Sequence, residues 1–301
     1  MTDHDQRFKV LLKEFFAEFL TLFFPERAVR FDLEHVEWLD KELFPDPPQG
    51  DVLVLDLVAR LRLRNADPAA EATETVALIH IEVESREAVA TFRRRMFEYY
   101  ESLRRKYNLP VLPVAVYLRV GLDGIGIDGY EENFDDLDVL RFRYLYVGLP
   151  ALEAERYVNG GNWLGVGLSA LMRVPKFRRA WLRSESLRRL TLECKENDYR
   201  RLLLWECVEA YSELDEQQQG VYKELLLTDR YKEIEPMQMT TYEKGMDKGK
   251  RSTTRLLLEH KWGPLSAAVL ERLETWPTDG LDELCRAALD GHSLRELGLE
   301  D

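Results

Sequence analysis

Hydrophobic positions follow two different periods along the chain, and the change of period separates predicted helices from predicted strands. Residues 5–24 carry apolar side chains at helical spacing up to Pro25, which predicts one amphipathic helix. A proline-rich loop over 44–50 follows. Residues 51–64 and 74–84 then have the composition of strands separated by a turn, so we expect a hairpin.

The next part of the chain adds a helix and two more strands. Helical spacing returns over 86–107, with apolar and aromatic side chains on one face. The nearly all-apolar run 112–120 is typical of a strand covered on both faces, and 141–147 is a further predicted strand. The stretch from Gly124 to Asp138 formally matches a dinucleotide-binding glycine motif, but its acidic residues would repel a pyrophosphate, so we expect an acidic loop.

The order of these elements predicts an α/β layer architecture, and beyond residue 150 the pattern is helical. Two helices are predicted over 163–189 and 198–227. A polar, glycine-interrupted segment then favours either a linker or an exposed helix. The expected units are a core over 1–150, a helical extension packed on it over 151–235, a linker over 236–254 and a small helical module over 255–301.

Composition narrows the function classes. The three cysteines and five histidines show neither a disulfide framework nor zinc-ligand spacing, which argues against a zinc enzyme. The N-terminal segment is acidic and the early apolar stretch is too short to span a bilayer, so we expect a cytoplasmic protein with no membrane partner. The net charge of −13 argues against a nucleic-acid partner, although positive residues cluster locally.

Three carboxylates stand in otherwise apolar strand sequences. Asp56 lies among valines and leucines, while Glu82 and Glu84 are two residues apart and therefore share a strand face with His80. Burying like charges side by side is costly, so such a group indicates a ligand. Carboxylates in an apolar frame suit a hard cation, Mg²⁺ or Mn²⁺. On spacing alone, strand-end residues paired with neighbouring arginines are an equally good interpretation.

Arginines are frequent on both sides of these carboxylates. Alternation places Arg60, Arg62 and Arg64 on the strand face of Asp56, and the helix over 86–107 is rich in positive charge. Cations near carboxylates suit a phosphate-bearing substrate, whereas a solvated helix face is the simpler explanation for most of them. The predicted DNA contacts are Arg60, Arg62, Arg86, Arg93 and Arg94. A second basic segment, 173–189, with Phe177 and Trp181 interleaved, allows the same two interpretations.

Four segments together resemble a known family. They are DQRFKVLLKEFFAEFLTLFFPE, DLVARLRLR, HIEVESR and RRRMFEYYESLRRKYNLPVLPVAVYL. The combination resembles the Rpn family (recombination-promoting nucleases, transposase-like, YhgA-like) of the PD-(D/E)XK nuclease superfamily. The likeness covers residues 3–150, extends more loosely to about 235, and the tail from about 240 is similar to a small domain often appended to such proteins. It implies a restriction-endonuclease-like core, a central mixed sheet flanked by helices, and Mg²⁺-dependent cleavage of DNA.

The resemblance also assigns residues. Asp56 matches the family's metal-binding aspartate, and Glu82 matches the glutamate of its E-x-Q or E-x-K motif. Position 84 is normally glutamine or lysine, so Glu84 adds a third carboxylate that would strengthen metal binding, demand a second ion or reduce turnover. Glu14 and Glu18 are both candidates for a further acid on the first helix.

The expectation is therefore a metal-dependent DNA endonuclease with Asp56, Glu82 and Glu84 as catalytic metal ligands. Double-stranded DNA is the expected partner, with RNA as a weaker option and a homodimer as a further expectation. A non-catalytic interaction module of the same fold is the alternative, and both Glu84 and the net charge of −13 favour it.

Overall fold

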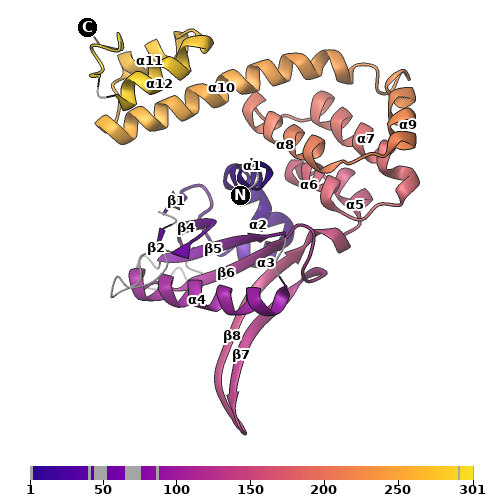
Figure 1. Ribbon diagram of the computed structural model, residues 1–301, viewed down its shortest axis with the longest axis vertical. Coiled ribbons are helices and arrows are strands. Elements are labelled where there is room, and N and C mark those ends of the chain that lie inside the picture. The colour runs from indigo at the N-terminus through magenta and orange to yellow at the C-terminus, as the bar shows by residue number, and fades with distance from the viewer. Residues whose placement is uncertain are drawn as a thin grey trace.

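The computed structural model describes residues 3–39, 42–43, 53–64, 76–85, 88–290 and 292–300. Within these ranges the N-terminal half forms a six-stranded mixed sheet flanked by helices, and the C-terminal half is helical (Figure 1). The α/β class predicted from the sequence is confirmed. Among the described helices, none combines the length and the apolar content needed to cross a membrane.

The sheet combines antiparallel and parallel pairing. Its strands, in spatial order, are β1 (Glu37–Trp38), β4 (Leu57–Arg62), β5 (Val76–Glu84), β6 (Val111–Tyr117), β8 (Leu137–Gly148) and β7 (Gly124–Phe134). The pairs β1–β4, β4–β5 and β7–β8 are antiparallel, while β5–β6 and β6–β8 are parallel. The predicted hairpin is thus β4–β5. A separate two-stranded ladder joins β2 (Glu42–Leu43) to β3 (Leu53–Val54).

Helices cover both faces of β5 because its side chains alternate. Ile79, Ile81 and Val83 join the main apolar core together with the N-terminal helices. The opposite face points to α4 (Val89–Tyr107), the crossover helix between the parallel strands β5 and β6. The apolar face predicted for this helix is confirmed at Phe92, Met96, Tyr99 and Leu103, which are buried. The helix ends at Asn108 in a left-handed conformation, as helix C-termini often do.

The N-terminal helix predicted over 5–24 is interrupted. The chain forms α1 (Asp3–Glu14), α2 (Phe16–Phe23) and α3 (Pro25–Ala28), with a break at Phe15. Phe15 is fully buried, so the apolar pattern runs through the break without a sequence signal. Pro25 ends α2 as expected, and it also begins α3 at the position where its missing N–H has no cost.

The segment predicted to be an acidic loop is strand β7, so that prediction is wrong. It pairs with β8 from Gly124 opposite Gly148 to Phe134 opposite Leu137, and Asp135 turns the chain with φ at 54°. Its acidic residues find cations across the hairpin, as Glu131 does with Arg143 on β8. The distal part of this hairpin projects away from the rest of the sheet (Figure 1).

The helical region is more divided than its sequence pattern predicts. Instead of two long helices, the chain forms α5 (Ala154–Val158), α6 (Trp163–Leu168), α7 (Arg179–Leu192), α8 (Asp198–Tyr211) and α9 (Glu216–Leu226), with 3-10 turns at Leu149–Ala151, Ser169–Leu171 and Lys176–Arg178. The break before α9 is fixed by a capping box in which Asp215 and Gln218 bind each other's backbone N–H.

A single long helix connects the helical region to the C-terminal end. This helix, α10 (Ile234–Trp262), contains the whole of 236–254. The sequence allowed either a linker or a helix over this segment, and the structure has the helix. Beyond it lie α11 (Ala267–Thr275), a 3-10 turn (Thr278–Gly280) and α12 (Leu281–Leu289). Leu258 of α10 packs with these helices in an apolar core separate from the main one.

Candidate active site

Asp56 and Glu82 meet where the β4–β5 ladder ends. Backbone pairing runs up to Leu57 opposite Ile81. Beyond that pair, side-chain carboxylates rather than backbone carbonyls accept the hydrogen bonds between the two strands. The Asp56 N–H donates to Oε1 of Glu82 at 2.9 Å, and the Val83 N–H donates to Oδ2 of Asp56 at 2.8 Å. Both acids are buried, with 9% and 3% of their surface exposed. The two carboxylates therefore occupy adjacent strand ends, as the sequence predicted.

Lys9 of α1 is the cation beside this pair, and the sequence interpretation missed it. Its Nζ lies 2.5 Å from Oδ1 of Asp56, and the lysine is itself buried. A signal was available, because Lys9 precedes Leu12 and Phe16 by three and seven residues and so shares their helical face. A lysine on the apolar face of a helix indicates a buried anion.

His80 completes the network on the α4 side of the sheet. Its Nε2 lies 2.8 Å from Oε1 of Glu82, within hydrogen-bond distance. The ring is fully buried and packs edge-on against Tyr99 of α4, with 5.6 Å between ring centroids. Its Nδ1 makes no hydrogen bond to any described residue.

Burial sets the protonation of Asp56. Loss of solvent, and after it the negative charge of Glu82, raise the pKa of the Asp56 carboxyl from 3.8 to about 6 against the opposing effect of Lys9. Asp56 therefore changes charge near pH 6. Such a displaced pKa is common at functional sites, although structural ion networks also produce it.

Glu84 is held apart from this pair. Its Oε2 accepts from Arg95 of α4 at 2.6 Å, and its Oε1 accepts from the N–H of Ser85 at 2.8 Å. The oxygens of Asp56, Glu82 and Glu84 do not all lie within 4.8 Å of one another. In the part of the chain that the structure describes, the one trio of acidic, histidine or cysteine side chains that meets this distance is Asp32, Glu34 and His35, and it is largely exposed.

The arginines expected around the acids lie elsewhere. Arg60 pairs with Glu37 on the neighbouring strand β1 at 3.4 Å, and Arg62 is opposite Val76, at the other end of the ladder from Glu82. Six residues of strand separate Arg62 from Asp56, which corresponds to about 20 Å. The expected cationic surroundings are thus supplied by Lys9 and Arg95 instead.

Two of the remaining predicted DNA contacts, Arg93 and Arg94, lie on α4. Arg93 forms two hydrogen bonds to the carboxylate of Asp128 on β7, at 2.8 and 2.9 Å, and so anchors the hairpin to the helix. Arg94 is exposed and pairs with Glu98 one turn along. Arg86 lies outside the described residues.

Neither candidate for a further acid is seen to contact the strand-end carboxylates. Glu18 accepts a hydrogen bond from Arg200 of α8, and Glu14 lies 4.0 Å from the same guanidinium. These glutamates therefore belong to the contact between the N-terminal helices and α8.

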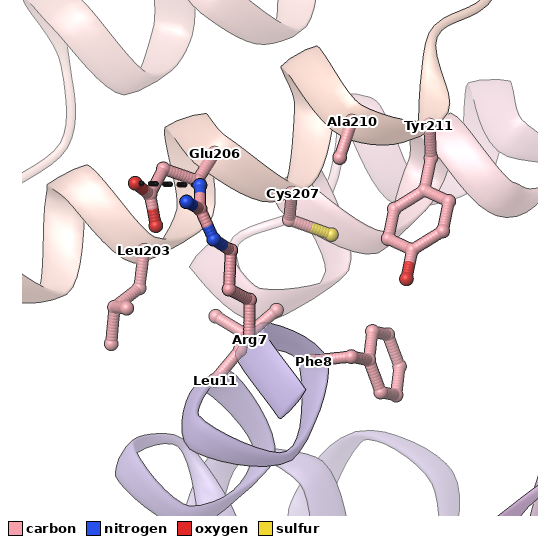
Figure 2. Close-up of a pocket in the computed structure, with 8 residues that line it drawn as sticks. All are labelled: Arg7, Phe8, Leu11, Leu203, Glu206, Cys207, Ala210 and Tyr211. Carbon is pink, nitrogen blue, oxygen red and sulfur yellow. Dashed lines mark hydrogen bonds and ion pairs between the residues drawn. The ribbon is translucent and has the colours of Figure 1, made fainter. Parts of the chain in front are cut away.

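The contact between α1 and α8 positions Lys9. Figure 2 shows Arg7, Phe8 and Leu11 of α1 facing Leu203, Glu206, Cys207, Ala210 and Tyr211 of α8. Arg7 bonds Glu206 at 3.3 Å, and the rings of Phe8 and Tyr211 pack edge to face. The cavity between the helices measures about 10 Å³, which is room for about one water molecule. It is a packing defect rather than a ligand site.

A scan against protein-family models, a search of curated proteins and a search of solved structures each found no match to this chain. The function therefore has to be inferred from the site itself. That site consists of two buried carboxylates between a lysine and a histidine, with a third carboxylate nearby that is bound to an arginine.

Proposed function

We propose that the chain is a Mg²⁺-dependent DNA endonuclease of the PD-(D/E)XK type, in which Asp56 and Glu82 are the metal ligands. The observation that carries this proposal is the convergence of these two buried carboxylates at the ends of adjacent strands. The architecture supports it, because three antiparallel strands, the crossover helix α4 and the parallel strand β6 form the kind of mixed, helix-flanked sheet that the family resemblance implies.

The donor set fits a hard divalent cation. Asp56 and Glu82 supply anionic oxygens, the ligands that Mg²⁺ prefers. Glu82 makes both of its hydrogen bonds through Oε1, so Oε2 takes no part in the network. When bound, the ion would polarise a phosphoryl oxygen and lower the pKa of a water molecule that attacks phosphorus.

Lys9 takes the role that position 84 does not fill. The family motif places a lysine or glutamine there, whereas Glu84 in this chain is neutralised by Arg95. Lys9 places an ammonium group beside Asp56 from the other side of the sheet. It keeps Asp56 ionised for metal binding, and its charge favours the extra negative charge that phosphate gains in the transition state.

Nicking of supercoiled plasmid DNA tests the proposal. We expect cleavage with Mg²⁺ and none in EDTA, and a loss of about 100-fold or more in Asp56→Asn and Glu82→Gln, which exceeds the usual effect of losing an outer-sphere partner. Glu101→Gln, an exposed change on α4, is the matched control and should cut normally. Cleavage in EDTA, or full activity of Asp56→Asn, would refute the assignment.

A second function has support from a specific observation. Because Glu84 pairs with Arg95 and the three acids do not converge, a non-catalytic module of the same fold, acting through binding, is the competing proposal. Thermal unfolding with and without Mg²⁺ or Mn²⁺ separates the two. A nuclease site predicts a metal-dependent rise in Tm that Glu82→Ala removes, whereas an unchanged Tm in both proteins supports the binding module.

A further inference from the structure

A second concave site lies where the sheet meets the helical region. We call it the arginine pocket; its volume is about 420 Å³, and its lining includes Leu118, Arg119, Met172, Arg173, Arg179 and Glu213. These residues come from the end of β6, the turn after α6, the start of α7 and the end of α8. The Leu118 N–H donates to the carbonyl oxygen of Glu84 at 2.9 Å, so the pocket begins at the same sheet edge as the acid pair.

The pocket is positively charged in a strongly acidic protein. Three arginines and a single glutamate line it, while the whole chain has a net charge of −13. Nη2 of Arg119 lies 3.7 Å from Oε1 of Glu213, and Nη2 of Arg173 lies 3.4 Å from Oε1 of Glu153. All four side chains are largely exposed. Exposed pairs of this kind are weak and readily exchanged for another anion. Arg179 makes no hydrogen bond or ion pair with any residue that the structure describes.

The pocket also has an apolar wall. It consists of the side chains of Leu118, Leu171, Met172, Val174 and Leu214, which line the same space as the arginines. A pocket of several hundred cubic ångströms that combines an apolar wall with a few convergent polar groups is typical of a small-molecule site. A ligand that satisfies both the wall and the arginines has an anionic group and an attached ring system of about the size of one nucleotide.

We propose that the arginine pocket binds the phosphate-bearing end of a nucleic-acid strand. Guanidinium groups match phosphate oxygens in pairs, and a terminal phosphate offers more charge and more free oxygens than a phosphodiester. The sugar and base of the terminal nucleotide pack on the apolar wall. The volume suits one nucleotide rather than a duplex, so a frayed or single-stranded end enters.

Phe177 gives independent support for an unpaired strand. It lies in the chain between the lining residues Val174 and Arg179, and 82% of its surface is exposed. Aromatic rings exposed among cations are the stacking platforms of single-strand binding proteins. The proposal that the pocket binds the end of a nucleic acid rests on the proposed nuclease function, which brings nucleic acid to this edge of the sheet. Binding to the pocket can nevertheless be measured separately from cleavage.

Fluorescence anisotropy with the full chain in EDTA tests the pocket without cleavage. The probes are 12-nucleotide single strands with a 5′-phosphate, a 3′-phosphate or hydroxyls at both ends, each labelled at the end that is not being compared. We expect either the 5′-phosphorylated or the 3′-phosphorylated strand to bind about tenfold more tightly than the strand with hydroxyls at both ends. This difference in affinity corresponds to about one strong charged contact. Arg119→Ala and Arg179→Ala should reduce that advantage to less than about threefold, with a weaker salt dependence.

Arg105→Ala is the matched control, since Arg105 is an exposed arginine of α4 paired with Glu101. It should retain the phosphate preference, and all variants should keep the Tm of the native chain because the substituted arginines are exposed. Equal binding of phosphorylated and hydroxyl strands would overturn the proposal. So would a nucleoside monophosphate that competes as well as the strand does, because the ligand would then be a free nucleotide.

The two proposals fail in different ways. Loss of Mg²⁺-dependent nicking with an intact phosphate preference contradicts the nuclease assignment and supports the pocket. Intact nicking with no phosphate preference contradicts the pocket alone. Asp56→Asn should bind the phosphorylated strand as the native chain does, because Asp56 does not line the pocket.

Discussion

Lys9 and Asp56 form a buried ion pair that joins the first helix to the sheet, with 2.5 Å between Nζ and Oδ1. Their side chains are only 7% and 12% exposed. Removing two charges from water is costly. The attraction between the two charges and the hydrogen bond from the Val83 N–H to Asp56 offset this cost. Loss of either partner leaves a buried charge uncompensated.

Lys9→Met should therefore destabilise the protein strongly at pH 8. Removing one member of a buried pair costs about 3–5 kcal/mol. At pH 5 the loss should be smaller, because Asp56 has a pKa of about 6 and is then mostly protonated in the native protein. Urea unfolding at both pH values measures the change. Lys13→Met, an exposed position on the same helix, is the control and should change little; an equal loss at both pH values for Lys9→Met would contradict the explanation.

The titration of Asp56 should change the free energy of unfolding between pH 4 and 6. Its carboxyl has a raised pKa, about 6 instead of 3.8, so the folded state binds the proton more tightly than the unfolded state. Stability from this group is consequently present below about pH 4 and is lost as pH rises through 6, by roughly 3 kcal/mol. Urea midpoints of native protein and Asp56→Asn across pH 4–8 should diverge over this window. Parallel curves would show that Asp56 titrates normally.

Glu84→Lys should introduce the lysine that the resembled nuclease motif often carries, without giving it that lysine's role. The new ammonium would lie beside Arg95, which now donates to Glu84 at 2.6 Å. We expect a loss of about 2 kcal/mol from the broken charged hydrogen bond, and no gain in Mg²⁺-dependent nicking. The charge swap Glu84→Lys with Arg95→Glu should recover most of the stability in thermal unfolding. If the single substitution were neutral, the pair would not be structural.

Two helical glycines should respond in opposite directions to leucine. A Cβ on Gly249 of α10 would lie 3.1 Å from Cε2 of Tyr199 on α8, so this glycine allows the two helices to approach. Gly249→Leu should cost about 1–3 kcal/mol. Gly220 of α9 has nothing within 4 Å of an added Cβ, and Gly220→Leu should stabilise by about 0.5–1 kcal/mol through helix propensity. Thermal unfolding of the pair decides, and a stabilising Gly249→Leu would contradict close packing of α10 on α8.

The spacing of apolar residues along the sequence predicted those parts of the fold in which this spacing alone decides which side chains are buried. The alternation of Ile79, Ile81 and Val83 with His80 and Glu82 assigned both faces of β5 correctly. Strand β7 was missed because its glycines and acids carry a weak strand signal. It forms a strand because β8 supplies the pairing partner and the compensating arginines, and both lie beyond any local window.

The sequence predicted that Asp56 and Glu82 lie close together, but it did not predict the cation beside them. Alternation from Arg60 and Arg62 back to Asp56 assumed a regular strand, yet β4 begins at Leu57, and Leu55 and Val58 lie in the same apolar cluster. The period is therefore broken at Asp56. Lys9 reaches Asp56 only because α1 is packed between the sheet and α8, a tertiary fact that spacing along the chain does not contain.

The long helix α10 fixes a length in this molecule. Ile234, in its first turn, belongs to the main apolar core, and Leu258 belongs to the C-terminal core. The 258 − 234 = 24 residues between them correspond to about 36 Å of helix. The C-terminal helices are thus held at a set reach and a set rotation. Deleting four residues from α10 would shorten that reach by about 6 Å and turn the C-terminal helices by about 40°, which makes distance and orientation adjustable from the sequence.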